Sequence, residues 1–175
     1  GQDLGSVQQR EQSLYMTWGK QPFILDFNEL KSKSLTVESE GAIKVLNPKT
    51  TIPVILKADT IVMDRSFFTS APFKILGRRA QLKNLESKEK VVLNVEKFEN
   101  SEKYVIKAPF LALKSTRGIN KGSLFAKELF LEGDWSNHHC IETDVFQVVG
   151  DAYYADSSSD VVAHLAMSVK VKEYT

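Results

Sequence analysis

Apolar and polar residues alternate along most of the chain, and the alternation is clearest in the last twenty residues. Its apolar positions are Val161, Ala163, Leu165, Met167, Val169 and Val171, and mostly polar or small residues stand between them. A period of two places successive side chains on opposite faces of a β-strand. We therefore expect a long strand with one buried face and one wet face, as is typical of antiparallel sheets.

Shorter stretches of the same kind recur from residue 23 onwards, separated by turn-forming residues. They are Phe23–Phe27, Leu35–Val37, Ala42–Leu46, Pro53–Met63, Val91–Val95, Tyr104–Leu113, Ser123–Leu131 and Thr143–Val149. Turn signals recur roughly every eight to twelve residues, and no long amphipathic helix is indicated. The pattern predicts an all-β fold, an antiparallel β-sandwich, jelly roll or barrel.

Residues 1–22 differ from the remainder because they are polar and rich in glutamine. Val7, Leu14 and Tyr15 fall near helical spacing, and Ser6 could cap a short helix. The alternative is a frayed terminal arm. We expect residues 1–22 to form this arm or helix and residues 23–175 to form a single all-β domain.

Two stretches match at an offset of fifty residues, VILKADTIVMD from Val54 and YVIKAPFLALK from Tyr104. Ala71–Leu76 and Ala126–Leu131 are shorter copies. Such strand–corner–strand units suit barrels, jelly rolls and stacked β-solenoids. Because the offsets are irregular, a coincidence among short apolar strings is the alternative. The Ala-x-x-apolar-x-apolar pattern resembles strands of jelly-roll lipopolysaccharide-transport proteins and stacked adhesin repeats, which implies a β-rich fold and no particular activity.

The parity of apolar positions predicts a corner at Ala108-Pro109. Ile106 and Ala108 share one face of an extended strand, whereas Leu111 and Leu113 share the other. All four can be buried only where the chain shifts by one residue at a bulge or corner.

Composition and charge narrow the class of partner. The chain has 175 residues, 42% of them apolar and 26% charged, which is ordinary for a globular domain. Its net charge of +1 disfavours a dedicated nucleic-acid binder, and the basic stretch after Arg78-Arg79 is interleaved with Glu86 and Glu89. No apolar run approaches the roughly 18 residues that span a bilayer. No cofactor is expected.

The densest group of potential metal ligands is His138, His139, Cys140 and Glu142, with His164 more distant. Imidazole, thiolate and carboxylate ligands bind zinc or copper. The alternative is a polar loop and strand edge. Cys140 is the single cysteine, so no internal disulfide can form.

Nucleophilic catalysis has less support in the sequence. His139 and Cys140 would point to opposite faces of an extended segment, so His139 is badly placed as a base. Ser157–Ser159 lie near Asp156 and His164. These residue types occur in catalytic triads, but a serine-rich surface loop is favoured because no nucleophile elbow is present.

Phe67, Phe68 and Phe73 are candidates for the entrance to an apolar groove, with ordinary core packing as the alternative. Taken together, the sequence predicts a non-enzymatic structural or interaction module, a surface, adhesive or virion-coat component that binds a protein partner or itself. One alternative is a carrier of a lipid or other apolar ligand. The other is a metal-assisted enzyme that uses the cluster at residues 138–144.

Overall fold

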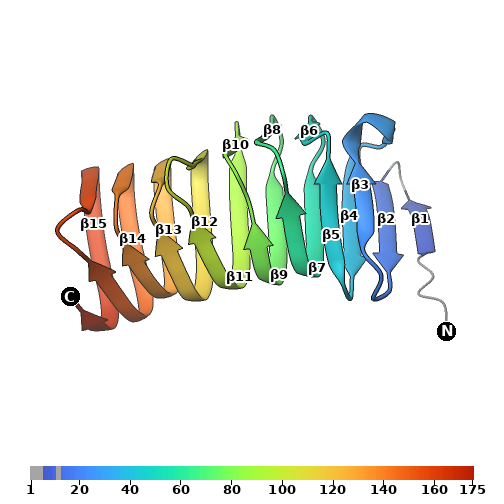
Figure 1. The fold of residues 1–175 in the computed structure, drawn as a ribbon. Helices are drawn as coiled ribbons and strands as arrows, with labels where there is room; N and C mark the ends of the chain where they lie inside the picture. The colour runs from blue at the N-terminus through green and yellow to red at the C-terminus, as the bar shows by residue number, and fades with distance from the viewer. Residues whose placement is uncertain (1–5, 11–12) are drawn as a thin grey trace.

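The chain coils into a rod of stacked parallel strands (Figure 1). The computed structural model describes residues 6–10 and 13–175. Its strands are β1 Ser6–Arg10, β2 Ser13–Trp18, β3 Phe23–Asp26, β4 Ser34–Ser39, β5 Ala42–Leu46, β6 Lys49–Thr50, β7 Val54–Met63, β8 Phe67–Thr69, β9 Phe73–Gln81, β10 Leu85–Ser87, β11 Lys90–Asn100, β12 Val105–Asn120, β13 Ser123–Asn137, β14 Cys140–Ala155 and β15 Asp160–Tyr174. Within these described residues there is also one 3₁₀ turn, η1, which spans Phe27–Glu29.

Each coil of the rod has three faces, which β12 illustrates. Its residues 105–108 lie on face C, residues 110–114 on face A and residues 117–120 on face B. At its start β12 pairs with β10, and from Phe110 onwards it pairs with β11. One coil spans 17 positions from Leu129 to its partner Phe146, and 21 from Ser13 to Ser34. Apart from the antiparallel pair β1–β2, every strand pairing in the described chain is parallel.

The expected antiparallel sandwich, jelly roll or barrel is therefore wrong, although the all-β content is confirmed. The structure is a β-solenoid, in which one continuous core fills the inside of the coils. A solenoid strand also has one face turned to the core and one to water. Its alternation is consequently the same as that of an antiparallel strand, and the pattern does not distinguish the two.

The corner predicted at Ala108-Pro109 is confirmed. Ile106, Ala108, Leu111 and Leu113 are all at most 2% exposed, so the buried parity changes between Ala108 and Leu111. Pro109 has no strand partner in β13, whereas Ala108 pairs with Ala126 and Phe110 with Glu128. The chain bends here from face C to face A.

The core is made of columns of inward side chains, one residue from each coil. On face A the column includes Leu56, Ile75, Leu93 and Leu113, all at most 2% exposed. Each fully buried aliphatic side chain stabilises the fold by about 1.5–3 kcal/mol relative to an exposed one. The rod therefore gains stability from each added coil, as other stacked-repeat proteins do.

Buried asparagines form a column at the end of face B, where β11, β12 and β13 each end. Asn100, Asn120 and Asn137 stand in register and are at most 3% exposed. The amide nitrogen of Asn100 donates to the side-chain oxygen of Asn120 at 2.9 Å, and that of Asn120 donates to Asn137 at 2.8 Å. The same nitrogen of Asn120 also donates to the backbone oxygens of Gly122 and Cys140. These bonds satisfy carbonyl groups at the turns that would otherwise be buried without a partner.

Face B also contains a glycine that makes room for an indole. Gly118 pairs with Trp135, and a β-carbon on Gly118 would lie 2.5 Å from the Trp135 ring. Trp135 is 1% exposed, and its indole nitrogen donates to the Glu132 carbonyl at 2.9 Å. Glycine at 118 therefore lets the largest side chain of the core stack directly on the coil below.

The short helix expected after Ser6 is wrong, because residues 6–10 and 13–18 form β1 and β2. The remainder of the predicted arm, residues 1–5 and 11–12, lies outside the described residues. β2 pairs in parallel with β4 and so forms part of the first coil. Among the described residues, no helix is long and apolar enough to cross a membrane.

Candidate functional site

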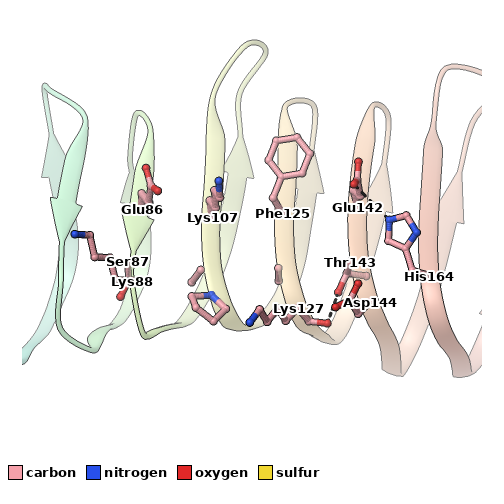
Figure 2. Close-up of a pocket in the computed structure, with 13 residues that line it drawn as sticks. Glu86, Ser87, Lys88, Lys107, Phe125, Lys127, Glu142, Thr143, Asp144 and His164 are labelled. Atoms are coloured by element: carbon pink, nitrogen blue, oxygen red, sulfur yellow. Dashed lines mark hydrogen bonds and ion pairs between the residues drawn. The ribbon is translucent and has the colours of Figure 1, made fainter.

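A shallow groove runs across the coils on face C, and we call it the face C groove (Figure 2). It has a volume of about 640 Å³ and extends from β10 to β15. Its outward side chains form one row in strand register, Glu86, Lys107, Phe125 and Glu142. Neighbouring side chains of this row stand on adjacent coils, so roughly 5 Å separates their backbones.

Small residues at the corner between faces C and A form the floor of this groove. Ala108, Pro109 and Ala126 line it between the longer side chains. At the same corner the Thr143 hydroxyl is within hydrogen-bonding distance of the Lys127 and Val145 carbonyl oxygens, at 3.0 and 2.9 Å. The groove is hollow here because the corner residues project little beyond the backbone.

Charges of both signs line the groove. Glu86, Glu142 and Asp144 are acidic, and Lys88, Lys107 and Lys127 are basic. His164 lies beside the row, with its Nε2 atom 3.4 Å from a Glu142 carboxylate oxygen. Phe125 is half-buried between Lys107 and Glu142. The groove therefore offers one aromatic surface flanked by a cation and an anion.

The predicted metal cluster is dispersed. His138 pairs with Asp156, while Glu142 faces His164 in the groove. His139 is exposed, and Cys140 stands in register with Ser123 and Asp160. Across residues 6–10 and 13–175, no three potential ligand side chains gather in a geometry that could hold a metal ion. These residue types can bind metal ions. In the coil, however, the side chains of residues that are adjacent in the sequence point in different directions.

His138, Asp156 and Ser158 form a small polar cluster next to the last coil. His138 Nδ1 lies 2.5 Å from Asp156 Oδ2, and the Ser158 hydroxyl donates to Asp156 Oδ1 at 2.6 Å. The hydrogen bond from His138 lowers the pKa of Asp156 to about 2, with a smaller contribution from Ser158. The Ser158 hydroxyl contacts the carboxylate of Asp156 and the backbone carbonyl oxygen of His138. This is not the serine–histidine contact that activates a nucleophile.

Cys140 is also unactivated. Partial burial raises the pKa of its thiol, and the charges of Asp160 and Glu142 raise it further. A thiolate is the reactive form of cysteine, so a raised pKa reduces reactivity at neutral pH.

The coil places the three phenylalanines that were proposed to bind an apolar ligand in two different environments, the core and the surface. Phe67 and Phe73 are at most 1% exposed, and their ring centroids lie 4.4 Å apart in the core. Phe68 points outward and is 46% exposed. Phe67 and Phe73 therefore have no surface with which to line a groove entrance, and their burial matches the alternative of ordinary core packing.

Sequence reasoning missed the face C groove. Its row Glu86, Lys107, Phe125 and Glu142 is separated by 21, 18 and 17 positions, which are single-coil spacings. Those spacings are informative only once the coil length is known. The residues carry no motif of their own.

The fold and the groove define the class of this protein as a β-solenoid with a solvent-open, mixed-charge groove along one face. Comparisons with protein-family models, with curated proteins and with solved structures found no match. The chemistry of the face C groove is therefore the basis for the function proposed below.

Proposed function

We propose that the protein is a structural interaction module without catalytic activity, and that it holds an extended segment of a partner protein in the face C groove. The observation that carries this proposal is the register row Glu86, Lys107, Phe125 and Glu142. A row of this kind crosses several coils, so a partner can make side-chain contacts along the rod.

The chemistry of the row favours a polypeptide as the occupant. Half-buried aromatic residues are common anchors of protein interfaces. Flanking charges of both signs contribute specificity, because they repel segments with the wrong charge order. The expected partner segment therefore has an apolar side chain opposite Phe125, an acidic residue opposite Lys107 and a basic residue opposite Glu142.

The remaining polar groups support a binding role rather than a catalytic one. Asp156 is held ionised by His138, and Cys140 has a raised thiol pKa. Neither environment produces the activated nucleophile or the base poised near neutral pH that catalysis requires.

The test is selection from a displayed library of random linear peptides. Wild-type protein should enrich peptides with an acidic, apolar and basic residue in a fixed order. The double variant Lys107→Glu, Phe125→Ala should bind these peptides at least about tenfold more weakly. Lys97→Glu is the matched control, because Lys97 is an exposed lysine on β11 outside this groove. The proposal fails if no peptide family is enriched, or if the double variant binds as well as the control.

A further inference from the structure

A second groove crosses the coils on face B, and we call it the face B groove. It has a volume of about 640 Å³ and extends from β7 to β12. Three exposed cations on adjacent coils stand in strand register within it, Arg79, Lys97 and Arg117. Neighbouring strands are about 4.8 Å apart, so the backbones that carry these side chains lie within roughly 10 Å of one another. We call this set the cationic row.

Arg78 precedes the cationic row in the sequence but differs from it, because Arg78 is neutralised. Its Nε atom donates to Asp59 Oδ1 at 2.9 Å, and its Nη2 atom donates to Asp59 Oδ2 at 3.2 Å. These hydrogen bonds lower the pKa of Asp59, with a smaller contribution from the charge of Arg79. Both carboxylate oxygens of Asp59 are thus engaged by Arg78.

The cationic row itself lacks carboxylate partners. Glu99 also lines the groove, but its Oε1 atom pairs with Lys121 Nζ at 3.1 Å. Among the side chains that the structure describes, no carboxylate forms an ion pair with a member of the row. Asp134 precedes Trp135, which pairs with Gly118, so a carboxylate follows the row on the next coil and ends it. Like charges on adjacent strands destabilise a sheet, and an anion bound in the groove would relieve their repulsion.

We propose that the face B groove binds a chain of condensed phosphates, either a free oligophosphate or the triphosphate of a nucleotide. An arginine guanidinium is a planar fork that binds two oxygens of one phosphate, and a lysine adds a mobile point charge. The row places one such fork on each side of an ammonium group. A concave site with charges of one sign also concentrates counter-ions. The volume of the groove is typical of small-molecule sites.

The groove suits a phosphate chain better than two other anionic polymers. Single-stranded nucleic acids bind where bases stack on aromatic side chains, but the aromatic residue that lines this groove, Phe98, is 4% exposed. In an extended acidic peptide, side chains on one face recur about every 7 Å, which exceeds the spacing of roughly 5 Å in the row. Linked phosphates carry their charges on adjacent groups and match the row more closely.

Isothermal titration calorimetry with sodium tripolyphosphate tests the site. Wild-type protein should bind tripolyphosphate saturably, and the variant Arg79→Gln, Arg117→Gln should bind it at least about tenfold more weakly. The matched control is Lys57→Gln, Lys74→Gln, which removes two exposed positive charges outside both grooves and should bind as wild type does. Absence of saturable binding by wild type, or equal binding by these two variants, would overturn the proposal.

The face B and face C grooves can be tested separately, because they lie on different faces of the rod. Lys97→Glu should lose tripolyphosphate binding and keep the peptides that the face C groove selects. Lys107→Glu, Phe125→Ala should lose those peptides and keep tripolyphosphate. Failure of one proposal therefore does not imply failure of the other.

Further probes define the chemistry of the ligand. Citrate, a tricarboxylate, and orthophosphate should each bind at least about tenfold more weakly than tripolyphosphate. Equal affinity for either of them would overturn the assignment to a phosphate chain. ATP that binds as tightly as tripolyphosphate would identify the triphosphate of a nucleotide as the ligand, whereas weaker binding of ATP would identify a free oligophosphate.

Thermal unfolding, followed by circular dichroism, separates binding from a structural role of the arginines. Without phosphate, Arg79→Gln, Arg117→Gln should be at least as stable as wild type, because repulsion within the row is reduced. Tripolyphosphate should raise the melting temperature of wild type but not that of the variant. A lower melting temperature of the variant without phosphate would show that the arginines stabilise the fold, and it would overturn the proposal.

Discussion

The asparagine column shows how single residues stabilise the rod. Asn120 donates to Asn137, Gly122 and Cys140, and all three bonds are lost when its side chain is removed. A buried group left without a partner costs about 1–3 kcal/mol.

We predict that Asn120→Ala lowers the free energy of unfolding by about 3 kcal/mol, measured by urea denaturation. Asn94→Ala is the matched control, because Asn94 is an exposed residue of the adjacent strand β11. It should change the stability by less than about 0.5 kcal/mol. Equal effects of the two substitutions would show that the column does not stabilise the fold.

Asp156 provides a second prediction at the residue scale. Its pKa is lowered from 3.8 to about 2 by the hydrogen bond from His138. The stabilising effect of this pair is therefore fully present above about pH 4 and is lost as the pH falls towards 2.

His138→Gln removes the imidazole that hydrogen-bonds to the Asp156 carboxylate, so the pKa of Asp156 should rise towards 3.8, as followed by NMR titration of its carboxyl carbon. The variant should also lose less stability than wild type between pH 4 and pH 2. Ser158→Ala should raise the pKa by a smaller amount, because Ser158 contributes less than His138. An unchanged Asp156 pKa in His138→Gln would contradict the assignment.

At the scale of the elements, each coil is a separable unit. Phe110 pairs with Glu128, so residues 110–127 form one complete coil that can be removed without shifting the register. After this deletion Asn100 would face Asn137, and the buried column would continue.

We predict that the chain lacking residues 110–127 folds and unfolds cooperatively, because each coil contacts only its neighbours. The control deletion of residues 110–118 removes half a coil and places inward residues on the wrong face. Circular dichroism and thermal unfolding distinguish the outcomes. If both deletions are equally disruptive, the coils are not independent units.

The strands and one corner were predictable from sequence, whereas the pairing was not. The parity change at Ala108 requires a bend in any β-fold, so the sequence contains that information. The copy at Ala126–Leu131 stands in true register with Ala108–Leu113. The match at an offset of fifty instead joins Leu56 on face A to Ile106 on face C.

The repeat length of the coils cannot be recognised in the sequence, because the coils differ in length and their corners have similar sequences. Coils of 17 to 21 residues do not give the constant spacing by which repeats are recognised. The site was hidden for the same reason. His138 meets Asp156 one coil later, and Lys107 lies beside Phe125 only after the chain has turned through three faces.

At the scale of the whole molecule, the central claim is that one parallel coil runs from the first strands to the last. One outward column follows face A through the rod: Thr36, Ile55, Lys74, Val92, Ala112, Phe130, Gln147 and Ser168. Neighbouring strands are about 4.8 Å apart, so each step along this column adds roughly 5 Å.

Pulsed electron–electron spin resonance measures these distances most directly. One spin label stays at Thr36 in a Cys140→Ser background, and the second moves to Ala112, Phe130, Gln147 and Ser168 in turn. The distance should increase by roughly 5 Å at each move, from about 19 Å to about 34 Å between backbones. Distances that stop rising, or fall as the label moves towards the C-terminus, would mean that the chain folds back on itself and would contradict the solenoid.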